Sequence, residues 1–250
     1  MRTRAFEACE AIRSSFSYQR AVRAQLLLRS RVNLTWPGDH VLEKGVAAVD
    51  ASYWGPGELF GVAVVVTYDP SGNVIACHEA YGPVCVPYVP GLLAFREARL
   101  MIPALASALK ARGVGLILVD GHGIAHPRRF GIASHLGVVL STPSIGVAKS
   151  LLYGDLVPCA LGTCIEANGE VLGVVLEGSG KRVFVSPGNQ IDVNKAFEVA
   201  RSMMREGYGV PYPLALADRL SKLERKRLSS TMPKEVVVQR CDGVLSEVLR

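Results

Sequence analysis

The sequence lacks several patterns that would assign it to a familiar class. None of its six cysteines forms a Cys-x-x-Cys pair or has a histidine at zinc-finger spacing. The first residues have no apolar core of a secretion signal, and no apolar run is long enough to cross a membrane. Only 20% of the residues are charged, and no low-complexity tract occurs. We therefore expect a cytoplasmic protein with no membrane partner, whose cysteines are reduced and packed as small apolar side chains.

The chain does have enough apolar sequence for one large core. It has 250 residues, 49% of them hydrophobic, which is at the upper end for a single domain. We expect one monomeric domain over residues 1–250, with a helical segment at about 1–32 and a catalytic core at about 45–228. The net charge of +6 favours a polyanionic partner only weakly. The basic run at 222–227 is more typical of a solvated helix face than of a binding patch.

The spacing of apolar residues predicts alternating strands and helices. Helices are predicted at 5–29 with an interruption near 14–15, at 92–112 with a kink or break at Pro103, and at 132–140, 193–205 and 213–227. Strands are predicted at 45–49, 60–68, 74–81, 116–119, 144–147, 159–166, 170–176 and 183–186. Turn residues at 69–73 and 168–169 predict two hairpins. The order indicates an α/β fold, a mixed sheet covered by helices on both faces.

Three carboxylates occupy positions where burial is costly. Asp50 and Asp120 each follow an apolar strand, and the carboxyl ends of neighbouring strands meet at a shared crevice. Glu97 is surrounded at helical spacing by apolar residues, namely Leu93, Leu100, Met101, Ala104 and Ala108. Taken singly, each is more typical of a strand-end turn or a buried ion pair. Together they favour a shared divalent cation, and hard oxygen ligands suit Mg²⁺ or Mn²⁺ better than zinc.

Residues able to move protons or neutralise phosphate lie beside these carboxylates. The loop after Asp120 contains His122 and His126 among glycines, which let the backbone approach a ligand closely. Lys149 follows another short strand and can offset the charge of a phosphate oxygen, although an exposed loop lysine is the ordinary alternative. The pattern favours chemistry on a phosphate group.

Six sequence blocks resemble the endonuclease V family in the family's order. They are VDAS at 49–52, PYVPGLLAFRE at 87–97, VDGHGIAHPRR at 119–129, GIASHLG at 131–137, IGVAKS at 145–150 and VFVSPG at 183–188. The resemblance implies a ribonuclease H-like fold that binds Mg²⁺, or Mn²⁺ in its place, through Asp50, Glu97 and Asp120. It also implies that His126 and Lys149 act in the active site.

The resemblance further implies a substrate and a cut. Family members incise the second phosphodiester bond 3′ to hypoxanthine, leaving 3′-hydroxyl and 5′-phosphate ends, as a step in DNA repair. Tyr88 would be inserted into the base stack as a wedge beside the extruded base. The implied base pocket consists of Gly91, Leu93, Gly121 and Ile132, and the implied substrate-binding set is completed by Pro90 and His135.

The C-terminal part departs from the family pattern. Asn189 stands where the family usually has histidine, and Pro-Tyr-Pro-Leu-Ala at 211–215 replaces Pro-Glu-Pro-Thr-Arg, although Asp218 still falls at a family acidic position. An asparagine there can hydrogen-bond metal-bound water. Two other functions stay open: a ribonuclease H-like protein that binds nucleic acid without cutting it, and a nuclease for RNA or branched substrates. The choice between DNA and RNA, and between one and two metal ions, is also open.

Overall fold

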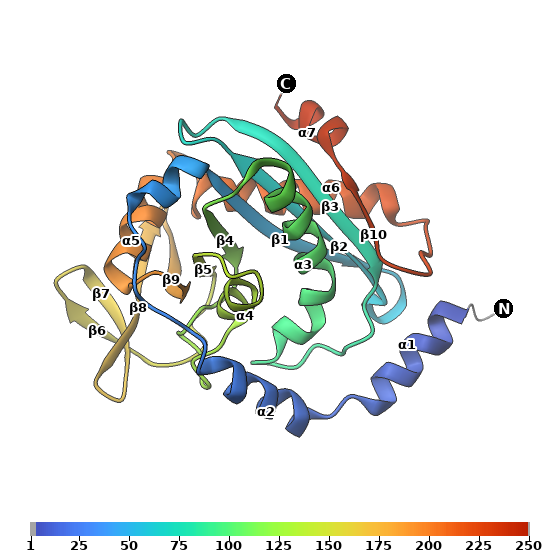
Figure 1. The fold of residues 1–250 in the computed structure, drawn as a ribbon, viewed down its shortest axis with the longest axis horizontal. Helices are drawn as coiled ribbons and strands as arrows, with labels where there is room; N and C mark the ends of the chain where they lie inside the picture. Colours follow the sequence, from blue (N-terminus) through green and yellow to red (C-terminus); the bar gives the residue numbers. More distant parts are fainter. Residues whose placement is uncertain (1–3, 250) are drawn as a thin grey trace.

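The computed structural model describes residues 4–249, and its centre is one mixed sheet (Figure 1). The ten strands lie in the order β10-β3-β2-β1-β4-β5-β9-β8-β7-β6. Their bounds are β1 Val46–Trp54, β2 Phe60–Tyr68, β3 Val74–Pro83, β4 Leu116–Asp120, β5 Ser144–Ala148, β6 Asp155–Cys159, β7 Gly162–Ala167, β8 Glu170–Gly178, β9 Lys181–Asn189 and β10 Val237–Arg240. This arrangement confirms the predicted α/β, ribonuclease H-like sheet.

The three middle strands run parallel and carry the site. β1 pairs in parallel with β4, and β4 with β5, so their carboxyl ends reach the same edge. These strands are buried on both faces, which explains their continuous apolar runs. β2 and β3 form the hairpin predicted from the turn at 69–73. β7 and β8 form the second predicted hairpin.

Helices cover both faces of the sheet, as predicted. α3 (Leu93–Arg112) and α4 (Ile132–Val139) pack on one face. α5 (Val193–Ser202), α6 (Tyr212–Leu228) and α7 (Asp242–Val248) pack on the other. Pro103 lies inside α3, and the helix continues through it, so the prediction of a break at this residue was wrong. Among the described residues, no helix combines the length and apolar character needed to cross a membrane.

The N-terminal segment forms two helices outside this core. α1 (Arg4–Ser15) and α2 (Tyr18–Arg29) run along the lower edge of the molecule in Figure 1. The interruption between them falls where the sequence predicted it, because Ser17 caps α2 by accepting a hydrogen bond from the backbone of Arg20. Two short 3₁₀ turns, Asp39–Lys44 and Pro56–Glu58, complete the connections.

One predicted strand was wrong, and the sheet extends beyond the segment predicted as the catalytic core. The strand predicted at 159–166 is divided between β6 and β7, which form a hairpin that turns at residues 160–161. Beyond the predicted catalytic core at about 45–228, β10 adds a strand beside β3, and α7 packs against β3. β10 is an edge strand with mostly exposed side chains, so its sequence has only a weak apolar pattern.

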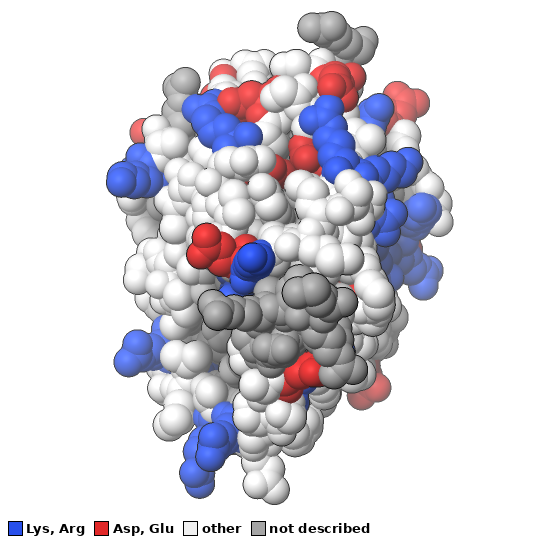
Figure 2. All heavy atoms as spheres, turned by 90° about the vertical axis from the view of Figure 1, so that its right-hand side faces the viewer, with Lys and Arg blue, Asp and Glu red and all other residues white. Residues whose placement is uncertain are grey.

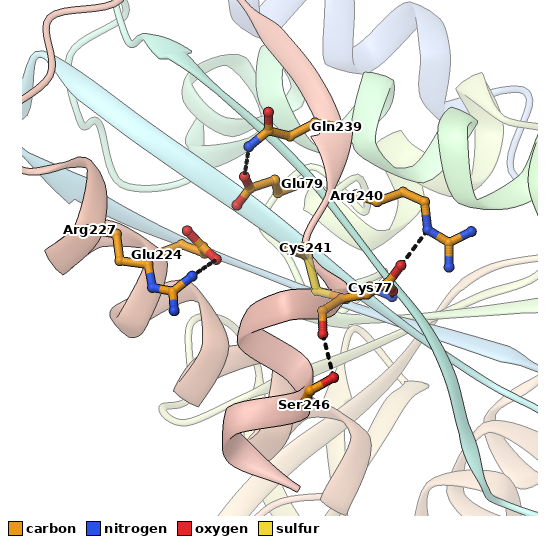
Figure 3. Close-up of a disulfide and its surroundings, with 9 residues drawn as sticks. Cys77, Glu79, Glu224, Arg227, Gln239, Arg240, Cys241 and Ser246 are labelled. Atoms are coloured by element: carbon orange, nitrogen blue, oxygen red, sulfur yellow. Dashed lines mark hydrogen bonds and ion pairs between the residues drawn. A yellow bond between two sulfur atoms is a disulfide. The ribbon is translucent and has the colours of Figure 1, made fainter.

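The cysteines are paired, which corrects the expectation that they are reduced. The disulfides join Cys9 to Cys85, Cys77 to Cys241, and Cys159 to Cys164. The first two span 76 and 164 residues, so only the folded chain brings their ends together. Figure 3 shows the second one, which fastens the start of α7 to β3 beside a hydrogen bond from Gln239 to Glu79.

Candidate active site

Three aspartates meet at the carboxyl edge of the parallel strands. Asp120 ends β4, Asp50 lies in the middle of β1, and Asp218 lies on α6, which packs across β1. One carboxylate oxygen of each lies within 4.8 Å of the others. β1 pairs with β4 up to Val49 and Val119, so Asp50 and Asp120 follow matched positions on neighbouring strands. The prediction that Asp50 ends its strand was wrong, since β1 continues to Trp54.

The electrostatics of this acidic trio, Asp50, Asp120 and Asp218, suit a bound cation. Burial raises the pKa of Asp50 to about 7, and the nearby charge of Asp120 adds to the rise. Two lysines offset the negative charge: Lys149 Nζ lies 2.5 Å from Asp120 and 3.6 Å from Asp218, and Lys222 Nζ lies 2.6 Å from Asp218. The three carboxylates could hold a metal ion, and carboxylate oxygens are the ligands that hard divalent cations prefer.

A buried serine, missed by the sequence analysis, orients Asp50. Ser221, one turn after Asp218 on α6, donates a hydrogen bond of 2.8 Å to Oδ2 of Asp50. Ser52 lies 2.8 Å from the same hydroxyl and can donate to it in turn. The hydrogen bond from Ser221 lowers the pKa of Asp50 and partly opposes the effect of burial. Serine has no sequence signal for such a role, since it depends on α6 crossing β1.

Glu97 lies close enough to the acidic trio to interact with the charges of Asp50 and Asp120. It lies on the apolar face of α3, as the spacing predicted, and is 7% exposed. The Tyr53 hydroxyl donates a hydrogen bond of 2.5 Å to its Oε1. Burial, and then the charges of Asp50 and Asp120, raise the pKa of Glu97 to about 8. The sequence predicted Asp50, Glu97 and Asp120 as the metal-binding set. Among the described residues, the close group of carboxylates contains Asp218 in place of Glu97.

A cavity of about 280 Å³ opens on one side of Asp120. Five residues expected to bind substrate line it: Tyr88, Gly91, Leu93, Gly121 and Ile132. Asp120 and Lys149 also line it, so the cavity reaches the acidic trio. Gly121 is needed here, because it has φ +149° and a Cβ would lie 2.5 Å from the side chain of Ile132. We call this space the base cavity.

Two other expected substrate-binding residues do not line the base cavity. Pro90 lies in the loop beside it, and His135 is buried in α4. The ring of His135 packs against Phe95 and Phe130, with centroids 5.7 and 5.5 Å away. Burial lowers the pKa of His135 to about 4.

His126 lines the base cavity, and both of its ring nitrogens form hydrogen bonds with backbone groups. Its Nδ1 accepts a hydrogen bond from the backbone N–H of Arg128, at 3.1 Å. Its Nε2 must therefore carry the proton, and it donates to the carbonyl of Gly91 at 2.9 Å. Burial lowers the pKa of His126 to about 4. The imidazole is thus neutral near pH 7 and holds the backbone in place.

A larger cavity of about 660 Å³ lies on the other side of Asp120. Four basic residues line it, namely Lys149, Lys181, Arg182 and Lys222, together with Asp120, Asp218 and Tyr208. We call it the basic groove. In the face shown in Figure 2, by contrast, basic and acidic side chains are mixed among wide uncharged areas.

Asn189 does not belong to the acidic trio. It is 3% exposed, donates to the carbonyl of Gly137 at 3.1 Å, and accepts from the backbone of Asn33 at 3.1 Å. It pairs with Ser144 at the start of β5, whereas Asp120 pairs with Val147 three residues further along. At about 3.3 Å per residue, Asn189 and Asp120 are therefore separated by roughly 10 Å along the strand direction. Both polar atoms of the Asn189 side chain thus bond the backbone of the fold.

The altered segment at 211–215 begins α6. Two of its residues, Leu214 and Ala215, line the basic groove. The helix still carries Asp218 into the acidic trio.

The chain is similar in sequence and structure to known nucleases. The sequence model described as Endonuclease V matches residues 27–219. Endonuclease V of Aeropyrum pernix is 46% identical over 216 residues, covering 84% of this chain and 81% of that protein. The structure of endonuclease V from Bacillus subtilis is 30% identical, with a TM-score of 0.75 over 85% of this chain and 93% of the other.

A third similar structure contains nucleic acid. Endonuclease V of Ciona intestinalis is 27% identical, with a TM-score of 0.70 over 84% of this chain and 98% of that chain. It is in complex with a 24mer DNA containing an inosine followed by a ribo-adenosine. The match over most of the chain, together with an acidic trio on a ribonuclease H-like sheet, shows that the protein belongs to the endonuclease V family and is a nuclease.

Proposed function

We propose that the enzyme hydrolyses the second phosphodiester bond 3′ to a deaminated purine, leaving 3′-hydroxyl and 5′-phosphate ends, as a step in DNA repair. The observation that carries the proposal is the position of Asp120, which borders both the base cavity and the basic groove. A strand with its base in the cavity passes over the acidic trio within a nucleotide or two. Its continuation then enters the basic groove.

The size and lining of the base cavity favour a single extruded base. Its volume of 280 Å³ is just below the range of roughly 300–1,000 Å³ found for drug-sized ligands. Tyr88 is 63% exposed at its rim and can replace the stacking that the base loses. The complex of the Ciona relative with inosine-containing DNA supports hypoxanthine as that base.

The residues of the chain have distinct tasks in the reaction. Asp50, Asp120 and Asp218 would hold Mg²⁺, or Mn²⁺ in its place, which when bound polarises the phosphate and lowers the pKa of a bound water. Lys149 offsets the charge that develops on the phosphate oxygens. The charges of Asp50 and Asp120 help to raise the pKa of Glu97, so a cation bound to them would favour its ionised form, whose negative charge would in turn strengthen cation binding. His126 keeps the base cavity in shape.

The enzyme acts as a monomeric single domain in the cytoplasm under this proposal. Disulfides are rare in reducing compartments, but intracellular proteins of some heat-adapted archaea and bacteria carry many.

Cleavage of end-labelled oligonucleotides tests the proposal. Duplexes that contain one inosine, and matched duplexes with adenosine, are incubated with Mg²⁺, Mn²⁺ or EDTA. We expect one product, cut at the second bond 3′ to inosine and absent with EDTA. The Asp120→Asn variant should lose more than about a hundredfold in rate, since such electrostatic interactions contribute several kcal/mol. Asp155→Asn, on the exposed strand β6, is the matched control.

Three results would overturn the proposal. Equal cutting of inosine and adenosine duplexes would remove the base specificity. Binding without cutting would indicate a nucleic-acid-binding module. Preferential cutting of inosine in RNA or of branched DNA, tested in parallel, would change the substrate.

A further inference from the structure

We infer that the N-terminal helices α1 and α2 clamp the Tyr88 segment, and that Gln25 is the residue that positions it at the base cavity. The Tyr88 segment is residues 84–92, which join β3 to α3. The inference rests on the proposed function, because it assigns Gln25 a part in holding the wedge of that reaction.

The Tyr88 segment has no regular secondary structure over most of its length and is fixed near both ends. Near its start, Cys85 forms the disulfide with Cys9 of α1. Near its end, Gly91 contacts Gln25 of α2. Tyr88 lies between these two attachments and projects into solvent. The N-terminal helices, which the sequence analysis placed outside the catalytic core, therefore hold the segment at two points.

The attachment at Gly91 is a concentrated polar contact. The Gly91 carbonyl accepts hydrogen bonds from Nε2 of Gln25 at 2.9 Å, Nε2 of His126 at 2.9 Å and the guanidinium of Arg128 at 2.8 Å. Gly91 has φ +77°, and a Cβ at this position would lie 2.8 Å from the Arg128 guanidinium. The backbone is therefore drawn against these donors in a conformation that favours glycine.

Gln25 connects this contact to the other wall of the base cavity. Its Nε2 donates also to the carbonyl of Phe130 at 3.0 Å, and its Oε1 accepts from Nε of Arg128 at 2.6 Å. The side chain is 1% exposed and lines the base cavity. A buried amide is costly unless its polar atoms are paired, and here both ends are paired across two loops. Removing it takes this partner from the Phe130 carbonyl and from Nε of Arg128, and it takes one of three donors from the Gly91 carbonyl.

The consequence for function is preorganisation. A wedge that is already held in position loses little conformational freedom when it enters the base stack, whereas a free loop must be ordered at that moment. The amide of Gln25 is bonded to Gly91, Phe130 and Arg128, none of which belongs to the acidic trio. Its loss should therefore affect the use of Tyr88 and leave metal dependence unchanged.

A double-mutant cycle between Gln25 and Tyr88 tests the inference. Gln25→Ala should lower kcat/KM on the inosine duplex about tenfold or more, with the same Mg²⁺ titration as the wild type. In a Tyr88→Ala background, the same change should cost less than about threefold, because the wedge is already lost. Gln19→Ala, an exposed glutamine on the same helix, is the matched control.

Gln25→Glu keeps the cycle informative if the alanine variant folds poorly. A carboxylate retains the size of the side chain and its bond to Arg128, but it replaces the donor to Gly91 with an acceptor. We expect it to behave as Gln25→Ala does. Independent, additive losses for Gln25 and Tyr88 would overturn the inference. An altered Mg²⁺ requirement in the Gln25 variants would overturn it as well.

Failure of the proposed function gives a different result. In that case the wild type cuts inosine and adenosine duplexes equally. If the wild type discriminates and the cycle is additive, only the inference about Gln25 is wrong.

Discussion

The Ser221 hydroxyl donates a hydrogen bond of 2.8 Å to Oδ2 of Asp50, and it does so from a helix that also carries Asp218. One turn of α6 thus supplies a carboxylate of the acidic trio and the group that orients another. Because partners behind metal ligands are often nearly as important as the ligands, this pair should control cation affinity.

Ser221→Ala tests that relationship. Removing the hydroxyl leaves a buried oxygen of Asp50 without its donor, so we expect the Mg²⁺ concentration for half-maximal cleavage to rise about tenfold. The rate at saturating Mg²⁺ should change much less. The measurement is a metal titration of cleavage. Ser229→Ala, an exposed serine just after α6, should leave the titration unchanged, and an unchanged titration for Ser221→Ala would assign the serine to packing alone.

Tyr88→Ala tests the wedge. Extruding a base from a duplex costs a few kcal/mol, and less from a single strand. The variant should therefore lose activity strongly on inosine-containing duplex and less on single strands, with metal dependence unchanged. The measurement is the ratio of kcat/KM for the two substrates. Tyr18→Ala, which changes an exposed tyrosine on α2 away from the Tyr88 segment, is the control. Equal losses on both substrates would indicate a role in folding the loop.

Asn189→His tests whether a family difference affects the metal. Because Asn189 bonds the backbones of Gly137 and Asn33 within the fold, we expect the Mg²⁺ requirement to stay the same. Stability should fall by about 1–3 kcal/mol, since the hydrogen bonds that join Asn189 to Gly137 and to Asn33 are both lost, each contributing about 0.5–1.5 kcal/mol. Chemical denaturation and a metal titration measure the two effects. A lower Mg²⁺ requirement in the variant would contradict the structure.

His135→Phe tests the buried imidazole through pH. The folded-state pKa is about 4, below the ordinary value of 6.5, so the unfolded chain binds the proton more readily. The wild type should therefore lose stability relative to the variant as pH falls from 6.5 towards 4, by up to about 3 kcal/mol. Above this range the difference between the two proteins should be constant. Denaturant unfolding at several pH values measures it, and a difference independent of pH would show that His135 charges freely in the folded protein.

The sequence predicted what local patterns determine. Apolar runs located the three parallel strands, and strand ends and helical spacing marked Asp120 and Glu97 as unusual. Asp218 was recognised through the resemblance alone, because an aspartate on an amphipathic helix is ordinary until the helix is placed across β1. Gln25 and Ser221 had no signal at all, since their roles depend on elements that lie far apart in the sequence. The cysteines were misinterpreted for the same reason, because spacing does not reveal pairs separated by 76 and 164 residues.

The two long disulfides have a consequence for the chain as a covalent object. Cys77 lies inside the loop closed by Cys9 and Cys85, while its partner Cys241 lies outside, so the two closed loops overlap. Any single backbone cut between Cys9 and Cys241 therefore leaves two pieces that are still joined by sulfur. A protease that nicks one exposed turn in this range releases no fragment, and the nicked molecule retains every strand of its sheet until a reductant separates the pieces.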